Sequence, residues 1–284
     1  MTNTKIIKLL RPLPANRTRE SLENQFLVEK ELADRLRKAN SIERKAILST
    51  MYDELFEKVP DHSRLSRRKS ESETRDYNQS KMSLLRRFLT QDCTLLEFGS
   101  GDCQFAYECA KLVKQVVAVE IVDQRPEGIK SPDNFKLQIY DGDEVLLESD
   151  TIDVAFSDQL LEHLHSDDVN SHFRSLYRIM KPGGVYLLRT PHAFTGPHDI
   201  SKYFSDTPQG FHMKEYTFRE IRDLTRRIGF RKVRCVMGVK GKFSVFIPFF
   251  YVATAEALIS MSRGKLRRAL SNRLLPALTV AVYK

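Results

Sequence analysis

The hydrophobic positions of residues 93–240 follow two alternating patterns, and these patterns predict the fold class. Short, mainly apolar runs alternate with segments in which apolar residues recur every three or four positions. The apolar runs are Thr94–Phe98, Val116–Val119, Ile152–Phe156 and Val185–Leu188. Buried strands that alternate with amphipathic helices are typical of a parallel sheet covered on both faces. The sequence therefore predicts an α/β protein with a doubly wound, Rossmann-like sheet.

The chain on either side of this core has a different character. Residues 1–78 are polar and contain two helical patterns followed by a linker rich in Ser and Arg, which predicts an N-terminal helical extension. Residues 79–240 form the predicted core, which we expect to begin with a helix near Gln79–Leu89. Within it, Thr217–Glu220 has the pattern of a capping box that opens a helix. Residues 241–276 are apolar and then basic, and we expect them to form a helical insert. Residues 277–284 have the pattern of a last core strand, which we expect to pair with a strand at Arg231–Val239.

The composition limits the class of protein. The chain has 284 residues, of which 41% are hydrophobic and 29% are charged, a balance that is typical of globular proteins. Its four cysteines form no CxxC pair, which argues against a zinc ribbon or a disulfide scaffold and fits a reducing cytoplasm. No signal peptide is expected, and the longest uncharged apolar run, Phe243–Ala255, is too short to span a bilayer. We therefore expect a cytoplasmic protein.

The net charge of +9 is concentrated near the C-terminal end. From Arg226 onwards the chain has 13 Lys and Arg residues and one acid, Glu256, so the preceding residues are slightly acidic as a whole. A basic end next to an apolar run indicates a local surface for anionic lipid or for an anionic substrate. Nucleic acid is a poorer match, because the aromatic residues lie apart from the arginines and no RNA-stacking motif is present. We expect no nucleic acid partner.

A glycine-rich turn follows the first predicted strand. Gly99 and Gly101, on either side of Ser100, allow the backbone to turn tightly and to approach a ligand closely. Glu120 ends the next strand, where a βαβ nucleotide fold places the carboxylate that binds ribose hydroxyls. Gln104 stands in place of the third glycine of the NAD-binding fingerprint, which disfavours a pyrophosphate. The turn therefore predicts a nucleoside ligand rather than a dinucleotide.

Four motifs, in this order, resemble the class I S-adenosylmethionine (SAM) dependent methyltransferases, in the type 11-like branch that includes small-molecule enzymes. They are LLEFGSGD (95–102), VVAVE (116–120), IDVAFSDQLLEHL (152–164) and RIMKPGGVYLLRTP (178–191). The resemblance covers about residues 80–240 and the last strand. It implies a seven-stranded methyltransferase sheet, SAM as the cofactor and a bacterial setting. It does not identify the acceptor, because this fold methylates small molecules, lipids, proteins and RNA.

The resemblance also implies cofactor-binding roles for residues of this chain. The residues that match the loop around the methionine part of SAM are Glu97, Gly99, Ser100 and Gly101. Glu120 matches the acid on the ribose hydroxyls, and Asp141 and Gly142 match the loop that contacts adenine. Ser157 matches the segment after the fourth strand that lines the cofactor. Many members have a glycine where this chain has Cys103, so the loop departs from the family pattern there.

Candidate catalytic residues follow the fourth and fifth core strands, where the crevice of the sheet should open. Asp158 ends the fourth, and the resemblance places it towards the substrate. The loop after the fifth presents His192 and His198, and it resembles a Thr-Pro-Asn...Gly-Pro-His-Asp loop of bacterial relatives with His192 in place of the Asn. Histidine has a pKa near working pH, so either residue can serve as a base. The alternative is that this loop is a rigid connector.

A metal site is a second interpretation of the histidine-rich region. His163 and His165, with Asp167 and Asp168, offer side chains that ligate metals. Their spacing is not the tight one that is typical of zinc sites. We prefer the interpretation of His163 as a packing or hydrogen-bonding residue, and we predict no metal.

Residues 243–273 also admit two interpretations. They can form a lid or helical pair packed on the N-terminal helices, or an interfacial element that contacts anionic lipid at the inner membrane face. The predicted function is methyl transfer to oxygen or nitrogen of a small-molecule, lipid or glycan-precursor acceptor. Two alternatives stay open, an RNA methyltransferase that uses the basic C-terminal surface and a non-catalytic SAM-binding scaffold.

Overall fold

The computed structural model describes residues 7–62, 65, 71–140, 145–239, 242–275 and 277–284. Within them, strands form one sheet. The strands are β1 (Thr94–Phe98), β2 (Gln115–Glu120), β3 (Phe135–Ile139), β4 (Ile152–Asp158), β5 (Met180–Thr190), β6 (Lys232–Val239), β7 (Phe243–Ile247) and β8 (Leu278–Tyr283). Their order is β3-β2-β1-β4-β5-β8-β6-β7. The first five strands pair in parallel, and β8 runs antiparallel between β5 and β6.

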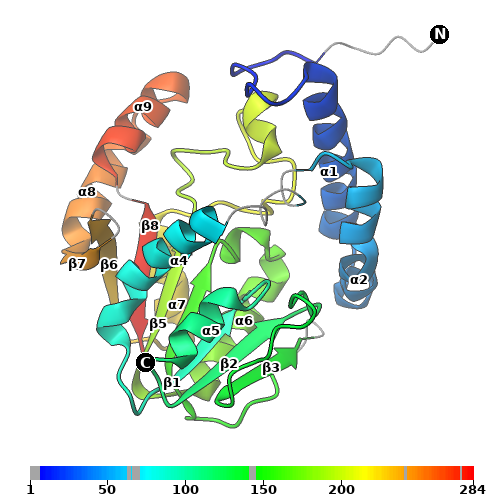
Figure 1. The fold of residues 1–284 in the computed structure, drawn as a ribbon. Coiled ribbons are helices and arrows are strands. Elements are labelled where there is room, and N and C mark those ends of the chain that lie inside the picture. Colours follow the sequence, from blue (N-terminus) through cyan, green and yellow to red (C-terminus); the bar gives the residue numbers. More distant parts are fainter. Residues whose placement is uncertain (1–6, 63–64, 66–70, 141–144, 240–241, 276) are drawn as a thin grey trace.

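Helices cover both faces of this sheet (Figure 1). The α-helices are α1 (Arg19–Lys38), α2 (Ser41–Lys58), α4 (Glu71–Leu85), α5 (Gln104–Ala110), α6 (Ser166–Ile179), α7 (Phe218–Ile228), α8 (Phe249–Ser260) and α9 (Gly264–Leu274). Short 3-10 helices span Arg86–Phe88, Leu161–His163 and Ile200–Tyr203. α4 and α5 pack on one face of the sheet, and α6, α7 and α8 pack on the other. The predicted doubly wound α/β fold is therefore confirmed.

The alternation of side chains along each strand explains the apolar runs. Leu95 belongs to the core cluster under α4 and α5, whereas its neighbour Leu96 belongs to the cluster under α6 and α7, and both are fully buried. Successive side chains of a strand point to opposite faces. Because helices cover both faces, both sets of positions must be apolar.

The sheet differs from the prediction in its number of strands. The described residues form eight strands rather than seven, and the additional one, β7, lies in the segment predicted to be helical. It pairs antiparallel with β6, so a hairpin extends the sheet edge before Pro248 and α8. β3 was not among the predicted strands because it is only partly buried and lacks an uninterrupted apolar run. A short apolar run alone does not distinguish a strand from a helix.

The helical elements show one further difference and one confirmed detail. α4 begins at Glu71, within the segment predicted to be a linker, because this polar stretch contains few residues that break a helix. The predicted capping box is present at the start of α7, where Thr217 and Glu220 bond to each other's backbone amides. The division of the chain into extension, core and insert stays a prediction.

The N-terminal helices pack on the segment that follows β5. Arg37 of α1 donates hydrogen bonds to the backbone oxygens of Gly210 (3.0 Å) and Gln209 (3.1 Å). Arg44 of α2, which is 4% exposed, forms a two-pronged ion pair with Asp168 at the start of α6. Arg37 thus provides partners for loop carbonyls, and Arg44 ties α2 to α6. The N-terminal helices therefore form one wall around this loop.

The C-terminal helices lie on the opposite side of the same loop (Figure 1). α8 and α9 are in orange and red, α1 and α2 are in blue, and the yellow segment after β5 lies between them. None of the helices in the described part of the chain combines the length and the hydrophobicity that crossing a bilayer requires.

Leu96 provides a test of this core. Leu96→Ala should lower the free energy of unfolding by about 2–5 kcal/mol, because it removes a fully buried side chain and leaves a cavity. The exposed Leu146 is the matched control, and Leu146→Ala should change stability by less than about 0.5 kcal/mol. Urea unfolding measures both. Equal effects of the two substitutions would contradict the assignment of Leu96 to the core.

Candidate active site

The carboxyl ends of the parallel strands meet at one edge of the sheet. The strand order reverses between β1 and β4, which have β2 and β5 as their outer neighbours. Such a switch point opens a crevice that binds ligands in doubly wound sheets. Three of the predicted features lie at this edge: the glycine loop after β1, Glu120 at the end of β2 and Asp158 at the end of β4.

The glycine loop and Glu120 are joined by a hydrogen bond. The backbone NH of Gly101 donates to Glu120 Oε1 (2.6 Å), and the NH of Ile121 donates to Glu120 Oε2 (3.1 Å). Gly99 and Gly101 have φ values of 75° and 58°, in the region that favours glycine. Among the described residues, no atom of another side chain or segment lies within 4 Å of the position that a Cβ at Gly101 would take, so they leave space open beside the loop. The carboxylate of Glu120 is thus held at the rim of this opening.

Cys103 occupies a backbone conformation that glycine adopts more easily. Its φ is 61°, and its side chain is fully buried. The side chain of Ser100, which is 5% exposed, contacts the Cys103 sulfur at 3.4 Å. Burial raises the pKa of Cys103 to about 11, so the thiol stays protonated. Glycine would adopt this left-handed conformation with less strain, and the small Cys side chain is accommodated in the turn.

Glu97 lies beneath the glycine loop and is paired with a lysine from α4. Lys81 Nζ lies 3.4 Å from Glu97 Oε1, while Glu97 Oε2 is buried and has no hydrogen-bond partner among the residues that the structure describes. Burial raises the pKa of Glu97 to about 7, although Lys81 opposes the shift. Burial also disfavours the charge on Lys81, but Glu97 and Asp158 outweigh it and raise the pKa of Lys81. One carboxylate oxygen is therefore available to a ligand that donates a hydrogen bond.

Asp158 is held by an arginine and a tyrosine. Arg189 at the end of β5 donates from Nε to Oδ1 (2.5 Å) and from Nη2 to Oδ2 (2.6 Å), and Tyr77 of α4 donates to Oδ2 (2.8 Å). Burial opposes ionisation of Asp158, but Arg189 outweighs it and lowers the pKa of Asp158. A carboxylate with this pairing is a weak base. In this arrangement Asp158 positions Arg189 and Tyr77, which differs from its predicted role as a catalytic residue.

Ser157 is buried and bonded to a tyrosine. Its hydroxyl lies 2.6 Å from the hydroxyl of Tyr186, which belongs to the core cluster under α6, and Ser157 is 1% exposed. Its role at the cofactor stays a prediction. The predicted adenine-contacting residues Asp141 and Gly142 lie outside the described residues.

His192 is a buried structural residue. Its Nε2 donates to Glu256 Oε1 of α8 (2.7 Å), and its Nδ1 accepts from the backbone NH of Phe194 (3.1 Å). Glu256 also accepts from the NH of Phe218 (2.6 Å) at the start of α7. His192 is 2% exposed and both ring nitrogens are engaged. The structure thus uses it to join the loop to α7 and α8, which differs from its predicted role as a base.

His198 is accessible. Its Nε2 lies 3.0 Å from the hydroxyl of Thr195, and its backbone NH donates to Glu215 Oε1 (2.7 Å). About a third of its side chain is exposed. Burial lowers the pKa of His198, although Glu215 opposes the shift, so the ring is neutral at neutral pH. Of the two predicted histidine bases, His198 is the one that the structure leaves accessible.

Glu162, His163 and His212 lie close together next to this loop. One possible ligand atom from each residue falls within 4.8 Å of the others. Glu162 is fully buried, and its Oε2 accepts from the hydroxyl of Thr190 (2.8 Å). Burial raises the pKa of Glu162 to about 7. Burial lowers the pKa of His212, but the hydrogen bond to Glu215 and the nearby carboxylates outweigh it and raise this pKa.

The sequence patterns did not single out several residues of this region. Tyr77 and Lys81 come from α4, and Arg189 is the penultimate residue of β5. The i, i+4 spacing of Tyr77 and Lys81 on one helix face was a usable signal. Glu162 and Glu215 were also not predicted, because their partners lie far away in sequence.

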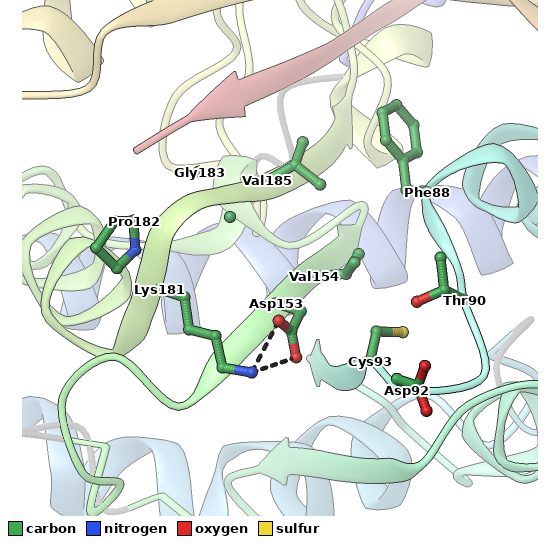
Figure 2. Close-up of a pocket in the computed structure, with 11 residues that line it drawn as sticks. Phe88, Thr90, Asp92, Cys93, Asp153, Val154, Lys181, Pro182, Gly183 and Val185 are labelled. Atoms are coloured by element: carbon green, nitrogen blue, oxygen red, sulfur yellow. Dashed lines mark hydrogen bonds and ion pairs between the residues drawn. The ribbon is translucent and has the colours of Figure 1, made fainter.

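A surface pocket lies at the opposite edge of the sheet. It is lined by residues that precede or begin β1, β4 and β5 (Figure 2). Lys181 Nζ lies 2.8 Å from both oxygens of Asp153, and Asp153 also accepts from the backbone NH of Thr94. These bonds join the amino ends of three strands. The pocket is therefore separate from the glycine loop, and its polar groups have a structural role.

Comparison with known proteins assigns a family. A model described as a methyltransferase domain matches residues 54–234, which is more than half of the chain. The chain is 28% identical over 106 residues to phosphoethanolamine N-methyltransferase 1 of Triticum aestivum, covering 34% of this chain and 21% of that protein. It is 28% identical over 151 residues to a probable SAM-dependent methyltransferase of Mycolicibacterium smegmatis, covering 51% and 54%. The matches therefore span about half or less of these relatives.

Solved structures share the fold. A Haemonchus contortus phosphoethanolamine N-methyltransferase 1, solved with phosphoethanolamine and S-adenosylhomocysteine, matches with a TM-score of 0.55 and 12% identity, over 86% of this chain and 50% of that chain. A chain from the complex of the Haloferax volcanii Trm112 methyltransferase activator with a methyltransferase matches with a TM-score of 0.50 and 16% identity, over 74% and 90%. This chain belongs to the methyltransferase domain family, and its fold is that of the class I SAM-dependent methyltransferases.

Proposed function

We propose that this chain transfers a methyl group from SAM to oxygen or nitrogen of an anionic acceptor, a small molecule or a lipid or glycan precursor. The choice of SAM as the cofactor follows from the family to which the chain belongs, whereas the acceptor is inferred from the residues around the loop after β5. The observation that carries the acceptor class is a group of basic side chains, Arg11, Lys202 and Arg268, next to the accessible His198.

The residues at the glycine loop fit the cofactor. Glu120 has a carboxylate at the opening beside Gly101, where it can accept hydrogen bonds from the two ribose hydroxyls. Glu97 has a buried oxygen without a partner, which suits the ammonium group of the methionine part. Lys81 lies beside Glu97 and provides a positive charge for the carboxylate of the same part. We assign these three residues to cofactor binding.

When bound, SAM supplies a methyl group on a sulfonium, which is already a strong electrophile. The task of the protein is then to orient the acceptor in line with that methyl group and to exclude water. α4 covers the carboxyl ends of β1 and β4 through Tyr77 and Lys81, and these contacts restrict access of water. His198 is neutral and accessible, so it can accept the proton of an acceptor hydroxyl or ammonium group.

Arg11 supports an anionic acceptor. Its Nη2 is buried and has no hydrogen-bond partner in the described segments. Burial lowers the pKa of Arg11, and the positive charge of Arg268 lowers it further. Arg268 donates from Nε to the backbone oxygen of Gly196 (3.1 Å), in the turn that also presents His198. Two guanidinium groups held close together favour a phosphate or carboxylate between them.

The comparisons support the same acceptor class. The wheat relative is named for phosphoethanolamine, and the nematode structure contains this phosphorylated amine. A phosphate group on the acceptor would suit Arg11 and Arg268. An amine on it would suit His198 as the proton acceptor. We therefore favour a phosphorylated amine or alcohol over a neutral acceptor.

We also propose that α8 contacts an anionic membrane surface. Phe250, Tyr251 and Leu258 are each about 60–65% exposed, and Met261 is 83% exposed. A shallow groove beside them is lined by apolar residues of α8 and by Arg219 and Arg222 of α7. Apolar side chains next to arginines suit insertion at the boundary of anionic headgroups. This contact would bring the loop after β5 close to a lipid-borne acceptor.

The cofactor assignment is tested with Glu120. Glu120→Ala should weaken the binding of S-adenosylhomocysteine more than tenfold, because the ribose loses two charge-assisted hydrogen bonds. The exposed Asp123 is three residues along the chain, and Asp123→Ala should leave the affinity unchanged. Titration calorimetry measures both. Unchanged affinity of the Glu120→Ala protein would remove Glu120 from the cofactor site.

The acceptor class is tested by labelled methyl transfer to matched pairs of compounds that differ by one phosphate, such as phosphoethanolamine and ethanolamine. The phosphorylated member should have a kcat/KM at least tenfold higher, and Arg268→Gln should raise its KM at least tenfold without changing cofactor affinity. Arg273→Gln, at an exposed position of the same helix, is the control. Equal use of both members would refute the anionic acceptor. Transfer of the labelled methyl group to RNA would support the alternative of an RNA methyltransferase. Cofactor binding without transfer to any acceptor would support the alternative of a non-catalytic scaffold.

The membrane contact is tested by sedimentation with vesicles. The native chain should bind vesicles that contain about a third phosphatidylglycerol and should ignore pure phosphatidylcholine. A Phe250→Asp, Leu258→Asp double variant should lose at least tenfold in affinity, because two exposed apolar side chains become charged. Ile42→Asp, at an exposed site on α2, is the matched control. If the native chain stays in the supernatant with both kinds of vesicle, the proposed contact does not exist.

A further inference from the structure

We propose that Glu162, His163 and His212 bind a divalent transition metal ion, with zinc as the best match. This site lies outside the cofactor-binding residues and goes beyond the methyl transfer proposed above. It departs from the prediction that the chain has no metal. It also differs from the alternative metal site considered from the sequence, which consisted of His163, His165, Asp167 and Asp168. Of those four residues, only His163 belongs to the present cluster.

The first observation is the convergence of three ligand side chains from separate segments. Glu162 and His163 belong to the 3-10 helix after β4, and His212 belongs to the loop that precedes α7. One possible ligand atom from each lies within 4.8 Å of the others. Ligands around one zinc ion are each about 2.0–2.2 Å from it, so a shift of the side chains by about 1 Å closes the site.

The second observation is an unpartnered oxygen in this cluster. Glu162 is fully buried, and its Oε1 has no hydrogen-bond partner within the described part of the chain, whereas its Oε2 accepts from Thr190. A buried carboxylate oxygen without a partner is unfavourable, and native structures usually satisfy it. A cation held between Glu162 and the two histidines satisfies it. Thr190 then fixes the orientation of the carboxylate from the opposite oxygen.

The third observation is the orientation of both imidazole rings. Nδ1 of His163 lies 3.0 Å from the backbone oxygen of Phe211, and Nδ1 of His212 lies 2.8 Å from Glu215 Oε1. Histidines that ligate a metal usually donate the NH of their other nitrogen to a carbonyl or a carboxylate. Here Nδ1 makes that contact in both rings, so Nε2 is the nitrogen of each ring that a metal ion would take. The ring centroids lie 5.0 Å apart in an edge-to-face arrangement.

The charge of the surroundings also favours a cation. Three carboxylates lie close to His212: Glu215 Oε1 is 2.8 Å from its Nδ1, Asp199 Oδ2 accepts from its backbone NH (3.5 Å), and Glu162 belongs to the same cluster. Asp199 and Glu215 are buried, at 9% and 7% exposed. A divalent ion offsets negative charge that burial would otherwise make costly.

The ligand set indicates the kind of metal. Two imidazoles and one carboxylate suit zinc and its neighbours in the transition series, and they are poor ligands for magnesium or calcium. Three protein ligands leave one coordination position open, as in catalytic rather than structural zinc sites. His163 is only partly buried, so that position can be reached from solvent. A phosphate or hydroxyl oxygen is the class of ligand that would take it.

The test uses the purified full chain after treatment with a chelator. Cobalt(II) serves as the probe, because its visible absorption reports the coordination, and zinc is then used to displace it. We expect one ion per chain with micromolar or tighter affinity, and visible bands without the thiolate-to-cobalt absorption that binding to cysteine would give. No stoichiometric binding, or a spectrum dominated by thiolate absorption, would overturn the proposal.

Matched variants locate the ion. Glu162→Gln retains a bond to Thr190, and His212→Asn retains an amide near the position of Nδ1, so both preserve the surrounding hydrogen bonds. Each should weaken cobalt binding at least tenfold. The control is His165→Asn, since His165 caps α6 and Asn is a favoured cap. Binding by His212→Asn as tight as in the native chain would place the ion elsewhere and refute the assignment.

Cofactor binding serves as the check on folding for each variant. Variants that bind S-adenosylhomocysteine normally and lose cobalt support the metal site. Cobalt binding is measured without methyl transfer, so its result tests the metal site independently of the proposed acceptor.

Discussion

The ion pair between Asp158 and Arg189 connects the parts on which the site depends. Asp158 ends β4, Arg189 lies near the end of β5, and Tyr77 from α4 donates to the same carboxylate. Asp158 and Arg189 are both largely buried. Removing one member of a buried pair leaves a charge without compensation, which typically costs about 3–5 kcal/mol. This interaction thus holds α4 over the carboxyl ends of the central strands, where we propose that the cofactor binds.

A second set of buried acids positions the loop after β5. Glu256 of α8 joins His192 to the start of α7, and Glu215 binds both His198 and His212. Arg37 of α1 bonds to carbonyls of the same loop. α1 and α8 therefore help to hold the conformation of the loop after β5, which we propose forms the acceptor side. We accordingly expect differences in these helices to contribute to acceptor specificity.

The core was predictable because its signals are local. Thr94–Phe98 was predicted with the same limits that β1 has, and the capping box at Thr217 is present as expected. Short-range patterns determine such elements. β7 was missed because an apolar run of five residues suits either a strand or a helix until its partner strand is known. α4 was placed too late in the chain because a polar surface helix has little hydrophobic periodicity.

The arrangement of the site residues was predictable only where they belong to one continuous segment of the chain. Glu120 lies next to the glycine loop as expected, because the βαβ unit that contains both fixes their relative positions. The roles predicted for Asp158 and His192 did not account for Arg189 and Glu256, whose contacts join distant segments. Such pairings depend on the tertiary fold. For the same reason Glu162 and His212 could not be brought together from spacing along the chain.

The central claim is that the crevice at the glycine loop binds SAM. The most direct measurement is titration calorimetry of the purified chain with S-adenosylhomocysteine, with NAD as the comparison ligand. We predict micromolar, one-to-one binding of S-adenosylhomocysteine and no binding of NAD. Absence of S-adenosylhomocysteine binding, or equal binding of NAD, would contradict the account.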